Sequence, residues 1–216
     1  MKKNIDEFSK LPFGEEVTNA ITHGVMALLI LGSLPFCAVL AYNRGGWIQV
    51  VGVSIFLISV FLMFITSCLY HSMDYNSTQK LVFRILDHCM IYVAIAGSYT
   101  PVALIVIGGW QGIVIIILQW FAVLVGVLYK SIAQRSIPKL SVGIYMIMGW
   151  SVVFFLPSLL NQAKLVFLLL IALGGLFYSF GAGFYLSKKK YTHAIWHFFI
   201  NFAALSHMGA IILFLN

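Results

Sequence analysis

The sequence has few charged residues, and acidic residues are especially scarce. Only 9% of its 216 residues are charged and six are Asp or Glu, whereas 62% are hydrophobic. Soluble domains carry about 25% charged residues, so a soluble fold would have too little polar surface to cover this much apolar side chain. The composition therefore excludes a soluble enzyme and predicts a polytopic membrane protein.

Cysteine is also scarce, and its placement indicates neither a disulfide framework nor a C-x-x-C metal motif. The three cysteines all fall in apolar segments: Cys37, Cys68 and Cys89. The N-terminus lacks the apolar run of a cleavable signal peptide, because Lys2 and Lys3 are followed by a polar, acidic stretch. We expect the first apolar segment to serve as an uncleaved anchor.

Long apolar segments are abundant, and there are seven of them. Each is near the roughly 20 residues that span a bilayer as a helix, and each is continuously apolar rather than alternating, which favours helices over barrel strands. Their approximate bounds are Asn19–Tyr42, Trp47–Tyr70, Leu81–Ile107, Trp110–Tyr129, Leu140–Leu160, Ala163–Leu186 and His193–Leu215. We predict an all-α fold with seven transmembrane helices in residues 19–216, after a short cytoplasmic segment of residues 1–18.

The basic residues predict the orientation of these helices. The net charge of +7 resides in short connections, so it indicates topology rather than a nucleic-acid partner. Eleven basic residues fall on the side of the N-terminus: Lys2, Lys3, Lys10, Lys80, Arg84, Lys130, Arg135, Lys139, Lys188, Lys189 and Lys190. Only Arg44 and Lys164 fall on the other side. The asymmetry predicts a cytoplasmic N-terminus and a C-terminus outside.

With this orientation, polar residues from three predicted helices reach a similar depth near the cytoplasmic face. Ser67 and His71 share one face at the end of the second helix, because they are four residues apart. Asp87, the only acid well inside a predicted helix, lies early in the third. His193 and His197 open the seventh, again four residues apart. Ionisable groups inside a bilayer are costly, so this convergence indicates a functional site.

The chemistry that fits these residues is a zinc site. Neutral imidazoles suit zinc, and three histidines with one open position are the pattern of catalytic sites, whereas structural sites use four protein ligands. We predict His71, His193 and His197 as the ligands. Asp87 would meet the metal through a water molecule and act as general base, and Ser67 would orient that water or a substrate carbonyl.

Other interpretations of the same residues are open. A histidine at a helix end is commonly an interfacial residue, and Asp87 has an alternative partner in Arg84, three residues earlier. We assign His88 to packing because it points about 100° away from Asp87 on a helix. His207 lies roughly 15 Å beyond His197 along the helix, too far for the same metal, and is expected to be a satisfied polar group.

Taken together, these motifs resemble the hemolysin III family, the bacterial branch of the progestin and adiponectin receptor family. The resemblance rests on S-x-x-x-H ending the second helix, an early Asp in the third and H-x-x-x-H opening the seventh. It also rests on Glu16, Asn19, Thr22 and His23, which match the E-x-x-N-x-x-T-H start of hemolysin III proteins. The resemblance implies three zinc-binding histidines, a cytoplasmic N-terminus and a multi-pass protein of the bacterial plasma membrane. From their positions alone, Glu16, Asn19 and His23 are expected to cap a helix or lie at the membrane interface. Only the resemblance makes them candidate site residues.

Two classes of function are compatible with these expectations. One is a zinc-dependent, ceramidase-like hydrolase that acts on an amide or ester of a membrane lipid. The other is a non-enzymatic membrane protein, either a lytic pore or a sensor of membrane lipid state, in which zinc is structural. No predicted helix is polar along its whole length, which weakens the case for a pore formed by a single chain.

Overall fold

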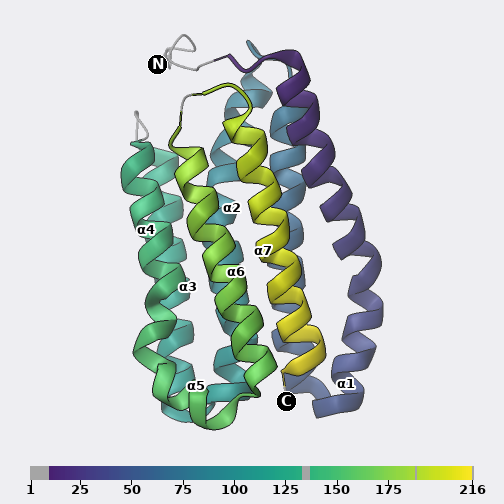
Figure 1. Cartoon of the computed structure of the whole chain (residues 1–216), viewed down its shortest axis with the longest axis vertical. Coiled ribbons are helices and arrows are strands. Elements are labelled where there is room, and N and C mark those ends of the chain that lie inside the picture. The colour runs from purple at the N-terminus through teal and green to yellow at the C-terminus, as the bar shows by residue number, and fades with distance from the viewer. Residues whose placement is uncertain (1–9, 133–136, 188, 216) are drawn as a thin grey trace.

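The chain forms a bundle of helices, and no strand occurs in the part that the computed structural model describes, residues 10–132, 137–187 and 189–215 (Figure 1). The elements are α1 (Phe13–Ser72), α2 (Thr78–Pro101), the π-helix η2 (Val102–Ile107), α3 (Gly109–Ile132), α4 (Pro138–Trp150), the 3-10 helix η3 (Ser151–Phe155), α5 (Leu156–Gln162), α6 (Leu165–Tyr185) and α7 (Thr192–Phe214). The all-α prediction is confirmed.

Four basic residues of the charge count lie outside the described residues: Lys2, Lys3, Arg135 and Lys188. The predicted N-terminal segment, 1–18, is described only from Lys10 onward. Six helical stretches of the described chain are long and apolar enough to cross a membrane: Phe13–Ser72, Thr78–Ile107, Gly109–Ile132, Pro138–Gln162, Leu165–Tyr185 and Thr192–Phe214.

The first of these stretches, α1, contains a reversal. A straight helix of its 60 residues would be about 90 Å long, three times the roughly 30 Å of a bilayer core. Gly45 and Gly46 have non-helical backbone angles, and Gly46 adopts φ 65° and ψ −153°, a region open essentially only to glycine. The purple half of α1 therefore runs down the bundle and the blue half returns (Figure 1). The reversal falls between the first two predicted helices, which were bounded by Tyr42 and Trp47.

Several helix bounds differ from the predicted ones. α1 begins at Phe13, after Pro12 at the N-cap, and not near Asn19. Its first turn contains Glu15 and Glu16, whose charges favour the positive end of a helix dipole. The other end of α1 extends through His71 to Ser72, slightly beyond the predicted end near Tyr70. The candidate site residues at both ends of α1 are thus held on regular helix.

The predicted third and fifth helices are not regular throughout. Beyond Pro101 the chain widens into η2, which ends at Gly108, where φ is 63°. The fifth segment is divided into α4, η3 and α5, and Pro157 lies at the start of α5. Proline cannot donate an amide hydrogen bond, which accounts for the irregular backbone before it.

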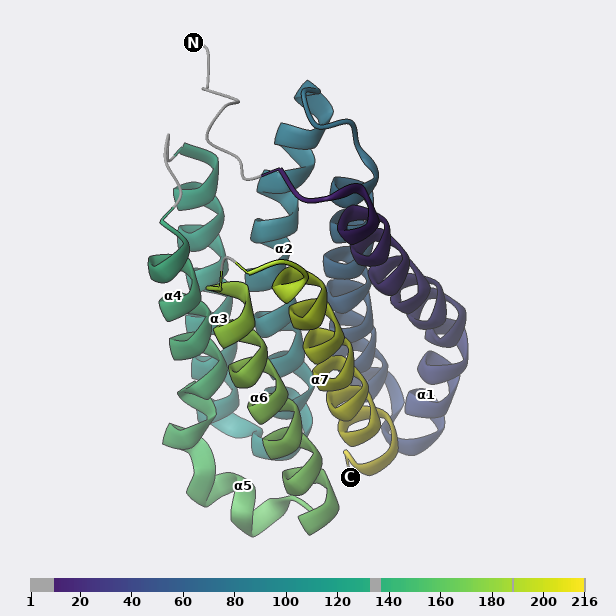
Figure 2. The same ribbon diagram turned by 45° about the horizontal axis from the view of Figure 1, so that its top comes forward.

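Helix packing brings the two ends of the sequence together. α1 packs against α2 and α7, and α7 also packs against α6. Large apolar side chains such as Phe154 and Ile147 are 84% and 74% exposed, as expected for a surface that contacts lipid. Figures 1 and 2 show the start of α1, the α1–α2 connection and the start of α7 at one end of the bundle. The predicted site residues lie at this end.

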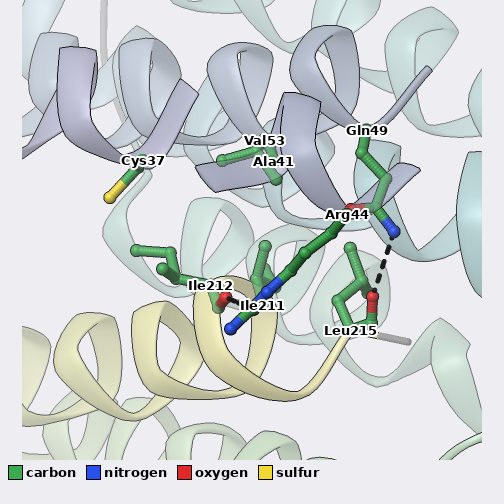
Figure 3. Close-up of a pocket in the computed structure, with 8 residues that line it drawn as sticks. All are labelled: Cys37, Ala41, Arg44, Gln49, Val53, Ile211, Ile212 and Leu215. Carbon is green, nitrogen blue, oxygen red and sulfur yellow. Dashed lines mark hydrogen bonds between the residues drawn. The ribbon is translucent and has the colours of Figure 1, made fainter. Parts of the chain in front are cut away.

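The opposite end of α7 is held by the reversal in α1 (Figure 3). Arg44 Nη1 donates to the carbonyl oxygens of Ile212, at 2.5 Å, and Leu213, at 3.4 Å. Gln49 Nε2 lies 3.5 Å from the carbonyl oxygen of Leu215. The last carbonyls of a helix have no partner within it, so these side chains satisfy the C-terminus of α7.

Candidate metal centre

The three predicted ligands lie together where the end of α1 meets the start of α7. The ring centroid of His71 is 5.2 Å from that of His193 and 5.0 Å from that of His197. The centroids of the two α7 histidines are 4.9 Å apart. One ring nitrogen of each lies within 4.8 Å of the other two, close enough to hold one metal ion. The i, i+4 spacing on α7 places its two rings on one face, as predicted.

The nitrogens of this cluster fit a metal because they lack other partners. His71 Nε2, His193 Nε2 and both ring nitrogens of His197 are buried and have no hydrogen-bond partner among the described residues. A buried polar atom left unpaired costs about 1–3 kcal/mol, so several at one point indicate a missing ligand. Three neutral imidazoles are a donor set that zinc accepts.

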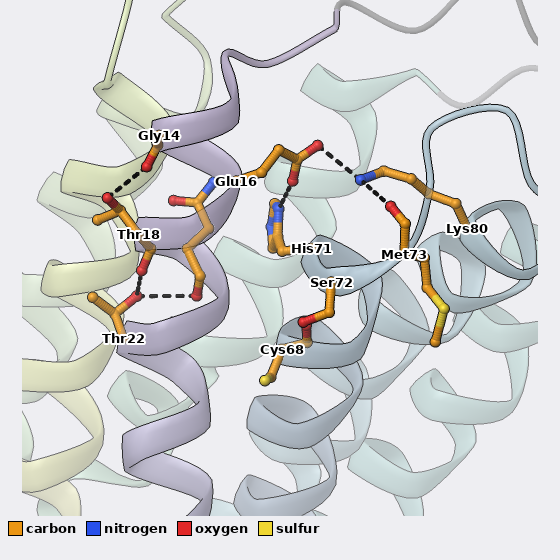
Figure 4. Close-up of polar contacts among 10 residues, drawn as sticks. Gly14, Glu16, Thr18, Thr22, Cys68, His71, Ser72, Met73 and Lys80 are labelled. Carbon is orange, nitrogen blue, oxygen red and sulfur yellow. Dashed lines mark hydrogen bonds and ion pairs between the residues drawn. The ribbon is translucent and has the colours of Figure 1, made fainter.

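Glu16 orients His71, a contact that the sequence did not predict (Figure 4). His71 Nδ1 donates to Glu16 Oε2 at 2.5 Å, and the other carboxylate oxygen accepts from Lys80 Nζ at 2.7 Å. Because Nδ1 carries the proton, Nε2 keeps the lone pair that a metal needs. Lys80 Nζ also donates to the carbonyl of Met73 at 3.3 Å. Glu16 therefore joins the start of α1 to the end of α1, through His71, and to the start of α2, through Lys80.

Asp87 and Ser67 lie beside the histidine cluster but outside it. Both are buried, and the Ser67 side chain is among the groups that interact with the Asp87 carboxylate. Asp87 interacts electrostatically with His71 and with Arg84. The group of three close ligand atoms does not include Asp87, an arrangement compatible with the predicted contact through water. The catalytic roles of Asp87 and Ser67 stay predictions.

Two further residues of α1 face the cluster. The His23 ring stacks on that of His197, with centroids 3.6 Å apart and planes at 10°. Asn19, one turn earlier, is fully buried. Both lie inside α1, beyond its first turn, so neither is the N-cap, which is Pro12. The signal for them was the spacing E-x-x-N-x-x-x-H, which puts Glu16, Asn19 and His23 on neighbouring positions of one helix face.

The remaining histidines are separate from the cluster. His88 Nδ1 donates to the carbonyl of Arg84 at 2.7 Å, and its Nε2 pairs with the Tyr185 hydroxyl at 3.2 Å. Nδ1 also lies 3.6 Å from Asp87 Oδ2, so the ring does not point away from that acid as predicted. His207 Nε2 lies 3.3 Å from the carbonyl of Ile171, but Nδ1 has no partner in the described chain. His207 is therefore only partly satisfied.

The fold and the site together define an all-helical integral membrane protein with a buried histidine cluster at one end of its helices. Comparison with known proteins gives the family. Residues 12–208 match the family model for haemolysin-III related proteins, and the chain belongs to this family.

Curated relatives agree with that assignment. The chain is 37% identical to the hemolysin-3 homolog of Bacillus subtilis (strain 168) over 187 residues, covering 86% of this chain and 87% of the relative. It is 39% identical to hemolysin-3 of Bacillus cereus over 188 residues, covering 86% and 85%. The monocyte to macrophage differentiation factor of Homo sapiens is 28% identical over 211 residues, covering 91% and 83%.

Proposed function

We propose that this protein is a metal-dependent hydrolase that cleaves an amide or ester bond of a membrane lipid, with zinc bound by His71, His193 and His197. The observation that carries the proposal is the cluster of three imidazoles with unpartnered nitrogens. No fourth protein ligand joins that group in the described residues. Three protein ligands leave one position open, as in catalytic zinc sites.

Each polar residue around the cluster has a distinct task in this proposal. Zinc, when bound, would polarise a substrate carbonyl and increase the acidity of a water molecule. Asp87 would accept a proton as general base, and Ser67, which interacts with its carboxylate, would orient the water or a substrate carbonyl. Glu16 keeps His71 in the tautomer that presents Nε2 to the metal.

A lipid substrate follows from the position of the site. The histidines lie in helices apolar enough to cross a membrane, which supports a substrate that would reach them from within the bilayer. A small cleft at the α1–α2 connection is lined by Tyr70, Tyr75, Lys80, Leu81 and Arg84. Its basic and phenolic side chains suit the polar head of a lipid whose acyl chain stays among the helices.

The proposal includes seven spans, with the N-terminus in the cytoplasm of a bacterial cell and the C-terminus outside the plasma membrane. The reversal at Gly46 supports two spans within α1. The termini at opposite ends of the bundle support an odd number of crossings (Figure 1). The proposed partner is membrane lipid, with no role for nucleic acid.

The test combines metal content with turnover of labelled short-chain ceramide and phosphatidylcholine by purified protein. Wild type is expected to bind one zinc per chain and to hydrolyse one of the two lipids. His193→Ala should lose both properties. Asp87→Asn should keep the metal and lose about 100-fold or more in rate, because general bases contribute on that order. Equal turnover in all three proteins would remove the enzyme proposal.

The second candidate is a structural metal in a non-enzymatic protein. It is favoured by the origin of the ligands, since His71 ends α1 and the other two begin α7, so that one ion would tie together helices distant in sequence. A protein that contains zinc, unfolds more readily without it and hydrolyses neither lipid would support this candidate.

A further inference from the structure

Asn19 and His23 form a second group of polar side chains that the metal ligands do not explain. They lie one turn apart on the first half of α1 and are 0% and 2% exposed. All four of their side-chain nitrogen and oxygen atoms lack a hydrogen-bond partner among the residues described here. In a protein surrounded by lipid, this arrangement costs free energy unless a guest molecule supplies the missing hydrogen bonds.

The packing of His23 places it at the side of the metal centre. One face of the ring stacks on His197, and the edge of Phe64 packs against it with centroids 4.8 Å apart and planes at 82°. The stack therefore puts the His23 ring directly beside the ring of the proposed ligand His197. His23 is nevertheless not part of the group of three close ligand atoms, so it neighbours the metal position without completing it.

The chemistry of these two residues indicates an uncharged guest. A carboxamide and a neutral imidazole each offer both a donor and an acceptor, and neither adds a charge. The nearest acid on the same helix face, Glu16, is already bound by His71 and Lys80. An amide or ester group, with a carbonyl oxygen to accept hydrogen bonds, matches this set better than a cation or a phosphate.

We propose that Asn19 and His23 form a carbonyl-binding subsite beside the metal centre, which holds the amide or ester group of the lipid. This inference rests on the proposed hydrolase function and names the residues that recognise the bond to be cleaved. Two hydrogen bonds from α1 would fix that group against the ligands on α7. The carbonyl oxygen would also satisfy one buried donor on each residue, the Asn19 amide and the protonated nitrogen of His23.

The experiment measures binding of acetohydroxamate, a small molecule with an amide carbonyl, to protein loaded with Co²⁺ in place of zinc. The visible spectrum of the cobalt reports both metal binding and probe binding without turnover. His23→Phe keeps a ring for the stack on His197 but removes the hydrogen bonds, and Asn19→Leu removes those of the amide at similar volume. Each variant should bind Co²⁺ within about threefold of wild type and the probe about tenfold more weakly, the effect of losing one hydrogen bond.

His207→Phe is the matched control, because it removes another histidine with a buried, unpartnered nitrogen, about 15 Å further along α7. It should leave the affinity for the probe unchanged. The subsite is overturned if both α1 variants bind the probe as wild type does, if wild type binds cobalt but not the probe, or if cobalt affinity falls in parallel with probe affinity. A wild type that binds the probe but hydrolyses no lipid would refute the hydrolase proposal and leave the subsite standing.

Discussion

At the scale of single residues, the carboxylate of Glu16 is expected to control metal affinity although it is not a ligand. Removing a group that orients a metal-binding histidine typically costs 10–100-fold in affinity. Glu16→Leu should weaken zinc binding by about this factor, since His71 Nδ1 and Lys80 Nζ both lose their partner. Glu16→Gln can still accept from His71 and should lose less than about tenfold. Zinc affinity is measured by competition with a chromophoric chelator.

The neighbouring acid supplies the control for Glu16. Glu15 is also buried, but its carboxylate accepts from the backbone N–H of Tyr191 at 3.1 Å and does not contact His71 in the structure. Glu15→Gln should therefore leave zinc affinity unchanged. Equal losses in the Glu15 and Glu16 variants would mean that the effect comes from the start of α1 as a whole.

These residues also show what sequence reasoning could reach. The i, i+4 pairs and the lone intramembrane acid brought His71, His193, His197, Ser67 and Asp87 to one place, because helical spacing and charge asymmetry fix face and depth. The Glu16–His71 contact joins residues 55 apart, and it depends on how the two halves of α1 pack after the reversal. Neither periodicity nor spacing contains that information.

At the scale of elements, the reversal in α1 depends on Gly46. A residue with a side chain in this positive-φ conformation costs about 1–3 kcal/mol. Gly46→Ala should therefore lower the free energy of unfolding by about that amount. Gly32 lies in the same element with regular helical geometry and open space around an added Cβ. Gly32→Ala should be neutral or slightly stabilising. Thermal unfolding in detergent compares the two, and destabilisation of equal size would contradict the argument.

A second element-scale prediction concerns the end of α7. Arg44 donates to two of its last carbonyls and places a positive charge at the negative end of the helix dipole. Arg44 is exposed, so Arg44→Ala should cost only about 1 kcal/mol of stability. Arg44→Lys retains the charge and should recover part of the loss. Hydrogen exchange at the last turn of α7 is the most direct measurement, and unchanged exchange in Arg44→Ala would exclude the cap.

The helix bounds that sequence reasoning missed have local causes. An apolar segment of the sequence shows where a membrane helix lies, but it does not show the polar helical turns that extend that helix at either end. The start at Phe13 was signalled by Pro12 followed by two acids, a pattern typical of a helix N-terminus. The break at η3 precedes Pro157, which restricts the backbone before it. The π-helix η2 follows Pro101 and ends at Gly108, and hydropathy does not reveal its changed winding.

At the scale of the whole molecule, the bound metal is expected to hold α1 and α7 together. A ligand that binds only the folded state stabilises it by about 2.7 kcal/mol at a concentration 100 times its Kd. Chelation should therefore lower the unfolding temperature of wild type and increase hydrogen exchange at residues 67–72 and 192–198. His197→Ala should already exchange like the chelated protein and respond no further to chelator. An identical response in both proteins would place the stabilising metal elsewhere.

The number of crossings is the last property that the whole molecule determines. A chain with six spans returns to the side on which it began, whereas the described chain begins and ends at opposite ends of the bundle (Figure 1). The 60 residues of α1 account for the difference, because each half is long enough to cross a bilayer core of about 30 Å. A reporter enzyme that is active only outside the membrane should therefore work when fused after Leu215 or in the turn at residues 43–46, and fail when fused before Phe13 or between residues 187 and 191. The fusion in the turn is decisive, because an α1 that crossed only once would keep that turn from reaching the outer surface. Activity at both termini would mean that the number of crossings is even, as with six spans.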